Sequence, residues 1–267
     1  MKTKILTDLT QTPYRLFFPI GIIGALLGLS RMLLPYTTSN IYWHRELMIT
    51  LFLFPVSVGF LFTAGPRFFA SFPVTVIEMV SGVLLFTGMI VFSLLDLQIA
   101  FAITRIAMLT LLLVFLTIRF IKRRSGNPVF SPFLFLGPFS GLLGSIAILV
   151  WLFNGNMLFY QLGRSLFHHG MFWVLFFGVG IKFFPMLTLS VRGLGELSNY
   201  DKFVGASRPL WLTVASLLLV TFIIEGSGYV VTAMWARFVL VFFMAKEGWL
   251  LFRPSPRRGV YTFVLKG

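Results

Sequence analysis

Residues 99–120 read IAFAITRIAMLTLLLVFLTIRF, a run in which only Arg105 and Arg119 are charged. A helix that crosses the hydrocarbon core of a bilayer needs about 20 mainly apolar residues. The run is continuously apolar and lacks the alternation typical of a strand in a membrane β-barrel. This stretch therefore predicts a transmembrane α-helix.

The composition extends this prediction to the whole chain. Of its 267 residues, 58% are hydrophobic and only 11% are charged, whereas about 25% are charged in soluble domains. Too few polar side chains are present to cover a water-facing surface, so residues 1–267 are predicted to form a single transmembrane domain. The chain has no cysteine, which excludes disulfides and thiolate metal sites.

Seven further apolar runs resemble the first. The predicted fold is therefore all-α, a polytopic integral membrane helix bundle of about eight helices. The predicted spans are Leu16–Leu34, Leu47–Ala64, Val74–Leu95, Ile99–Phe120, Phe133–Phe153, Leu166–Leu187, Leu210–Gly226 and Tyr229–Leu251.

Lysine and arginine fall at the N-terminus, in every second connection and in the C-terminal tail. Cytoplasmic loops of membrane proteins have this bias, so both termini are predicted to be cytoplasmic and the chain to lie in a bacterial inner membrane. The same distribution explains the net charge of +14 without nucleic acid, and makes the lipid bilayer the expected partner. The basic residues at these places are Lys2, Lys4, Arg15, Arg67, Arg119, Lys122, Arg123, Arg124, Arg192, Lys202, Arg208, Arg253, Arg257, Arg258 and Lys266. Arg31 and Arg164 are exceptions to this pattern.

The halves 1–125 and 126–267 resemble each other weakly, which suggests a 4+4 parallel repeat. The alternative is that any two sets of apolar helices look alike. In either case, His44 is predicted to open the second span and His168 and His169 the sixth, at the outer face of the membrane.

The first candidate ligands are His44 and Met48. Four residues apart, they are neighbours on one face of a helix. Imidazole and thioether groups suit haem iron or Cu(I). The alternative interpretation is an interfacial belt, because Tyr42 and Trp43 precede the histidine.

A second candidate set is His168, His169 and Met171. Adjacent side chains on a helix diverge by about 100°, so at most one of the two histidines can address a given metal. Met171 lies three residues after His168 and near its face. Two His/Met pairs at a similar depth favour a metal site.

Charged residues within the apolar spans support an alternative function. Glu78, Arg105, Lys182 and Arg237 should face the bundle interior, a partner or water, unless they reach the headgroups. Glu78 and Lys182 are candidates for an ion pair, while Arg105 and Arg237 could meet haem propionates or another anion. A small metal-free transporter or channel would use Glu78, Arg105 and Lys182. A third alternative is an assembly subunit, and the sequence leaves open whether the chain is an enzyme.

Residues 44–66 resemble the NnrS family of bacterial membrane proteins. The family signature opens with His-x-His-Glu-Met and closes with Gly-Phe-Leu-x-Thr-Ala-x-Pro. Residues 59–66, GFLFTAGP, match the closing part, and His44 and Met48 match two positions of the opening. Glu46 stands where the second histidine would be. Residues 13–19 and 168–185 resemble other parts of the family.

This resemblance implies a haem- and copper-associated protein of the nitric oxide response or denitrification. The expected function is therefore a haem-binding inner-membrane protein of nitrosative stress, with copper as the second candidate cofactor and nitric oxide as a ligand. His44 is expected to be one axial ligand and His168 or His169 the other. Met48 and Met171 would lie near the metal, and Arg45 or Arg164 would bind propionates. The chain is expected to act alone or as a homo- or hetero-oligomer.

Overall fold

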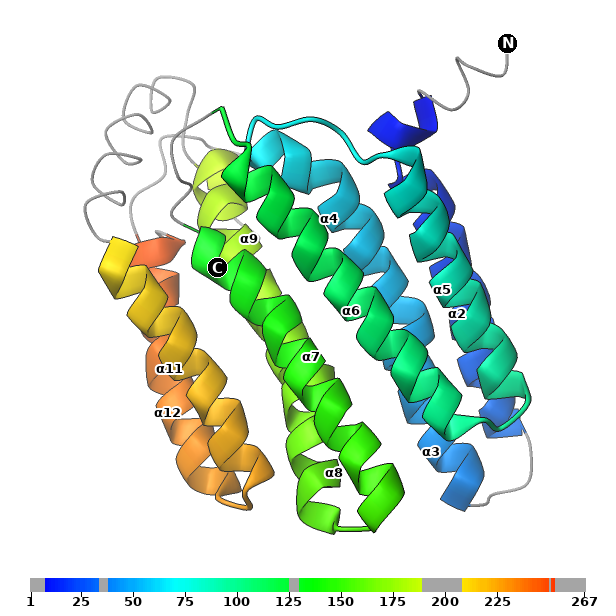
Figure 1. Ribbon diagram of the computed structural model, residues 1–267. Helices are drawn as coiled ribbons and strands as arrows, with labels where there is room; N and C mark the ends of the chain where they lie inside the picture. Colours follow the sequence, from blue (N-terminus) through cyan, green and yellow to red (C-terminus); the bar gives the residue numbers. More distant parts are fainter. Residues whose placement is uncertain (1–7, 34–37, 125–129, 189–207, 250, 253–267) are drawn as a thin grey trace. The chain divides into compact units, whose positions relative to one another are not determined.

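The computed structural model describes residues 8–33, 38–124, 130–188, 208–249 and 251–252 (Figure 1). Its regular elements in these ranges are all helices, as predicted. Basic residues of the two terminal regions, together with Arg192, Lys202 and the side chain of Arg208, lie outside this description. The predicted cytoplasmic orientation therefore stays a prediction.

The chain divides into two compact units, Met1–Gly126 and Asn127–Gly267. This division lies one residue from the boundary between the two halves expected from the sequence. Each unit is described below by itself, and the parallel repeat stays a prediction.

Unit 1 contains four long helices. The second is continuous from Ile41 to Phe68, and a π-helical turn interrupts its α-helical hydrogen bonding. The elements of unit 1 are α2 (Tyr14–Leu33), α3 (Thr38–Leu47), η1 (Met48–Leu53), α4 (Phe54–Phe68), α5 (Val76–Leu94) and α6 (Gln98–Ile121).

Unit 2 repeats this pattern of a long helix followed by one with a π-helical turn. Its second helix is continuous from Met157 to Phe184. The elements of unit 2 are α7 (Ser131–Asn154), α8 (Met157–Arg164), η2 (Ser165–Gly170), α9 (Met171–Thr188), α11 (Arg208–Gly226), α12 (Val230–Phe243) and η3 (Met244–Gly248).

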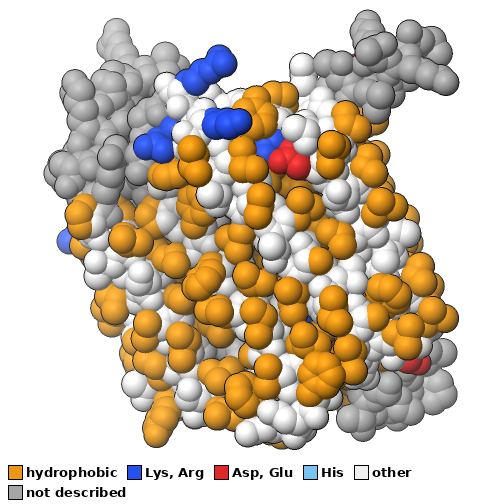
Figure 2. All heavy atoms as spheres, in the orientation of Figure 1, with side chains coloured by type: hydrophobic (Ala, Val, Ile, Leu, Met, Phe, Trp, Pro, Cys, Tyr) orange, Lys and Arg blue, Asp and Glu red, His pale blue; other side chains and the backbone are white. Residues whose placement is uncertain are grey.

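Seven helices among the described residues are long and apolar enough to cross a membrane. The predicted eighth span corresponds to α12 and η3, which carry three charged residues, Arg237, Lys246 and Glu247. Exposed apolar side chains such as Ile22 and Trp235 suit contact with lipid. Hydrophobic side chains also predominate on the face that Figure 2 shows. The chain is a multi-pass membrane protein.

The predicted spans agree with the helices except at the starts of the second and the sixth. The second helix begins at Thr38, not at Leu47, so the prediction that His44 opens it is wrong. The sixth helix begins at Met157, not at Leu166, because a turn of two residues, Gly155 and Asn156, suffices to reverse the chain. Gly155 adopts φ +69°, which ends α7, and the Asn156 side chain accepts from the Leu158 amide. The prediction that His168 and His169 open the helix is therefore wrong. His169 lies about 18 Å along the axis from Met157, at 1.5 Å per residue.

Close packing of the first two spans positions η1. A Cβ placed on Gly24 would lie 1.9 Å from the carbonyl oxygen of Leu51, so no side chain fits between these backbones. A π-helical turn shifts the helical register and is frequent at functional sites. Here it lies directly after the segment that carries His44.

Candidate functional site

His44 is fixed by the backbone of the preceding span. Its Nδ1 atom lies 2.9 Å from the carbonyl oxygen of Gly28 on α2. A carbonyl only accepts hydrogen bonds, so Nδ1 carries the hydrogen and Nε2 keeps its lone pair. Nε2 makes no hydrogen bond to any residue that the structure describes. The half-buried imidazole is therefore oriented and able to bind a ligand through Nε2.

Met48 packs against the same glycine. A Cβ placed on Gly28 would lie 2.9 Å from the Met48 sulfur. His44 and Met48 thus share one stretch of α2, as expected for residues one helical turn apart. The positions of His44 and Met48 therefore both depend on the close approach of the first two spans.

The residues on either side of His44 differ in their burial. Trp43 is only 1% exposed, and its ring packs edge-on against Phe101 with centroids 5.4 Å apart. Arg31 reaches from the end of α2 to the carbonyl oxygen of Ser93, 3.0 Å away. Trp43 therefore packs against other helices of unit 1, whereas Arg45 on the same helix is exposed. The interfacial belt stays an alternative interpretation of this segment.

A buried ion pair lies two residues beyond His44. Arg105 Nη1 is 2.6 Å from Glu46 Oε2, and each side chain is 1% exposed. The same guanidinium nitrogen lies 3.4 Å from the Thr50 hydroxyl in η1. The pair compensates two charges that would each be unfavourable inside a membrane. Arg105, expected to meet an anion or to line a pathway, is instead bound by Glu46.

In unit 2 the two adjacent histidines have different surroundings, as their divergence on a helix predicts. His168 is 8% exposed, and its ring contacts that of Phe167. His169 is half-buried, with 44% of its side chain exposed, and its Nδ1 atom lies 3.4 Å from Glu225 Oε1. Of the two, His169 has the more open imidazole.

Glu225 belongs to a polar network that the sequence did not reveal. Its other carboxylate oxygen forms an ion pair with Arg237, whose Nε donates to the Thr221 hydroxyl at 3.3 Å. The guanidinium carbon also lies 4.0 Å from the centre of the Phe222 ring. The only signal in the sequence was an acidic residue at the end of the seventh span and a basic one within the eighth.

The other two predicted site residues of unit 2, Met171 and Arg164, differ in their exposure to solvent. Met171 is fully buried directly after η2, and Arg164 is partly exposed at the end of α8. His44 belongs to unit 1, whereas His168 and His169 belong to unit 2. Their pairing as two axial ligands stays a prediction.

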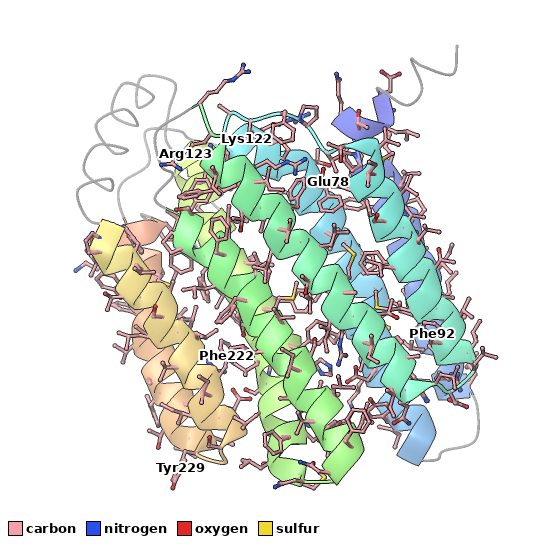
Figure 3. The ribbon with its side chains drawn as sticks, in the orientation of Figure 1. Glu78, Phe92, Lys122, Arg123, Phe222 and Tyr229 are labelled. Atoms are coloured by element: carbon pink, nitrogen blue, oxygen red, sulfur yellow. The ribbon has the colours of Figure 1, made fainter. Side chains whose placement is uncertain are left out.

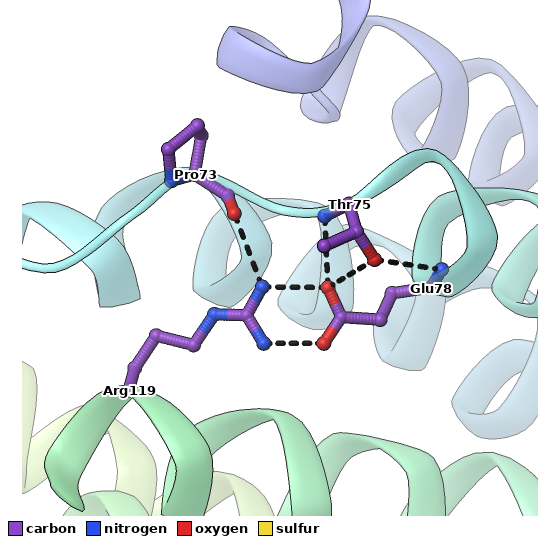
Figure 4. Close-up of polar contacts among 4 residues, drawn as sticks. All are labelled: Pro73, Thr75, Glu78 and Arg119. Carbon is purple, nitrogen blue, oxygen red and sulfur yellow. Dashed lines mark hydrogen bonds and ion pairs between the residues drawn. The ribbon is translucent and has the colours of Figure 1, made fainter. Parts of the chain in front are cut away.

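Glu78 has a structural role in unit 1 (Figure 4). Both of its carboxylate oxygens bind the guanidinium of Arg119, which is fully buried and donates a further hydrogen bond to the Pro73 carbonyl at 3.1 Å. Thr75 and Glu78 also form a capping box at the start of α5. The structure thus gives Glu78 a different partner from the expected Lys182, whose Nζ lies 5.6 Å from the Phe130 ring.

The Glu78 end of unit 1 is also its basic end. Figure 3 places Lys122 and Arg123, which follow α6, at the same end as Glu78, with Phe92 near the other. Lys122 lies 5.6 Å from the Phe72 ring, next to the Arg119 pair. We therefore interpret Thr75, Glu78, Arg119 and Lys122 as a structural clamp at this end of unit 1.

No group of three or more His, Cys, Asp and Glu side chains is placed to hold a metal ion within the described ranges. Haem iron takes at most two axial ligands from a protein, so single well-oriented histidines remain suitable for it. Copper would require additional donors beside His44, such as the Met48 thioether.

Comparison with known proteins identifies the family. The family model described as NnrS protein matches residues 8–261, nearly the whole chain. No curated protein and no solved structure matches. The match covers both units and every helix described above, so the chain belongs to the NnrS family.

Proposed function

We propose that this protein binds haem in the bacterial inner membrane and takes part in the response to nitric oxide. The observation that carries the proposal is the hydrogen bond from His44 Nδ1 to the Gly28 carbonyl, at 2.9 Å. Membership of the NnrS family supports the link to nitric oxide.

The His44 geometry suits an axial ligand. Histidines that bind metals almost always donate their other ring N–H to a carbonyl or a carboxylate, which fixes the tautomer and the orientation of the ring. His44 does so toward Gly28, and the Nδ1 atom of His169 lies 3.4 Å from a carboxylate oxygen of Glu225, within ion-pair distance. We therefore assign His44 as one axial ligand and favour His169 over the more buried His168 as the other.

The other groups have supporting roles in this proposal. Haem iron, when bound, supplies a site for diatomic ligands such as nitric oxide. Arg45 and Arg164, both at least partly exposed, are the donors proposed for propionates. Met48 would shield the His44 side from water, and copper bound through His44 and Met48 is the second candidate cofactor.

In the transporter alternative, two of the three residues proposed for the pathway are held in structural ion pairs. Glu78 is bound by Arg119, and Arg105 by Glu46. A conduction pathway needs groups that can exchange partners with a substrate, which buried pairs of this kind do poorly. We therefore retain haem binding as the proposed function.

An optical spectrum of the detergent-purified protein, oxidised and reduced, tests the proposal, with metal analysis of the same sample. We expect a Soret band that shifts on reduction and again on addition of nitric oxide. A colourless protein from haem-replete cells would overturn haem binding. If the metal analysis finds copper and no haem iron, copper becomes the proposed cofactor.

A further inference from the structure

We infer that Glu225 is a positioning residue that acts through His169, and that Arg237 and Thr221 hold it in place. The inference rests on the proposed haem function. It adds to the site a residue that lies at the end of the seventh predicted span. It also selects His169 as the ligand from unit 2.

The position of Glu225 is determined by three neighbours. One carboxylate oxygen faces His169 Nδ1 at 3.4 Å, and the other is paired with Arg237. Arg237 is oriented in turn by its hydrogen bond to Thr221 and by the Phe222 ring. Because the guanidinium occupies one oxygen, the carboxylate cannot turn away from His169 without losing the ion pair.

A second contact fixes the helix that carries His169 against this network. The Ser165 hydroxyl in η2 donates to the Phe222 carbonyl on α11 at 2.8 Å, and both residues are buried or nearly so. Ser165 precedes His169 by about one helical turn. The two elements are therefore held together beside the Glu225–His169 contact, which keeps the imidazole in reach of the carboxylate.

The negative charge of the Glu225 carboxylate determines its effect on the imidazole of His169. A carboxylate that accepts from Nδ1–H places the lone pair on Nε2, raises the basicity of the ring and strengthens its bond to a metal. The Gly28 carbonyl fixes His44 in a similar way but without a full negative charge. Glu225 should therefore stabilise the oxidised iron more than the reduced iron, which lowers the reduction potential.

The test measures the haem midpoint potential and the haem affinity of the full-length protein and of E225Q. Glutamine keeps the shape of the side chain and removes its charge. We expect the potential of E225Q to rise and its haem affinity to fall by about 10- to 100-fold, as is typical for a lost partner of a metal ligand. E225D, which keeps the charge, should restore a potential closer to that of the parent protein.

E247Q is the matched control, because Glu247 is a second carboxylate of unit 2 and, among the described residues, its ion pair is with exposed Lys246. Its potential should not change. Since E225Q leaves Arg237 without its partner, E225Q/R237M provides a second variant that removes both charges. A raised potential in this folded double variant would also support the inference.

The outcomes separate the inference from the proposed function. A parent protein without haem would overturn both. A haem-loaded parent whose potential is the same in E225Q, E225Q/R237M and E247Q would overturn only the inference. Full haem retention in H169A with loss in H168A would also overturn it, because Glu225 faces His169.

Discussion

His44 donates a hydrogen bond to the backbone carbonyl of Gly28, across the interface between the first two spans of unit 1. The orientation of the imidazole therefore depends on how closely these two helices pack. The close approach at Gly24 and Leu51 lies one helical turn away from Gly28 along α2. Helix packing and the candidate site are thus coupled.

The first prediction concerns Gly24. A Cβ at this position would lie 1.9 Å from the Leu51 carbonyl oxygen, so G24A must separate the two helices. We expect a loss of about 1–3 kcal/mol of stability, the usual effect of overpacking, together with weaker haem binding. Thermal unfolding in detergent and the Soret absorbance measure the two effects.

Gly88 on α5 is the matched control, because a Cβ there would meet Phe92 and Thr104 at an ordinary 3.7 Å. G88A should be neutral or slightly stabilising, since alanine favours the helix by up to about 1 kcal/mol over glycine. Equal effects of G24A and G88A would contradict the packing argument.

The second prediction concerns the buried Glu46–Arg105 pair. Removing one partner leaves an uncompensated charge, so E46Q and R105Q should each lower stability by about 3–5 kcal/mol. The double variant should lose much less than the sum of the two. A double-mutant cycle on thermal unfolding measures the coupling, and additive losses would show that the two side chains do not interact.

The third prediction separates the Glu78 clamp from the haem site. T75A removes the cap of α5 and should cost about 1 kcal/mol. E78Q should destabilise more, since it also breaks the pair with buried Arg119. Both variants should keep the haem content of the parent per folded molecule. Loss of haem in folded E78Q would contradict a purely structural role.

Most of the fold could be predicted from apolar run lengths, because a span must be about as long as the bilayer is thick. The main errors were the starts of the second and sixth spans, whose helices begin at Thr38 and Met157. Residues 157–164, MLFYQLGR, include Arg164 and Gln161 and are less apolar than the runs around them. Only the two-residue turn at Gly155 and Asn156 shows that they belong to the sixth helix.

The site was only partly predictable. The residue types of His44 and Met48 identified one candidate ligand set, but the partner of His44 is a backbone carbonyl that carries no sequence signal. Glu225 and Arg237 are 12 residues apart, on two helices joined by a turn. Their contact depends on the relative rotation of those helices, which an apolar pattern does not specify.

The fourth prediction tests the orientation in the membrane. The chain has no cysteine, so each introduced cysteine is unique. N156C and S227C lie in exposed turns on the predicted outer side, whereas R124C follows α6 on the predicted inner side. A membrane-impermeant maleimide should label N156C and S227C in spheroplasts, and R124C only after the membrane is permeabilised. The reverse pattern would place both termini outside.

The most direct test of the central claim is the ratio of haem to protein in H44G, purified with and without imidazole in the buffer. The variant removes the proposed axial ligand and leaves space for the free base. We predict that H44G loses most of its haem and that imidazole restores the Soret band. Full haem retention in H44G without imidazole would contradict the assignment of His44 as a ligand.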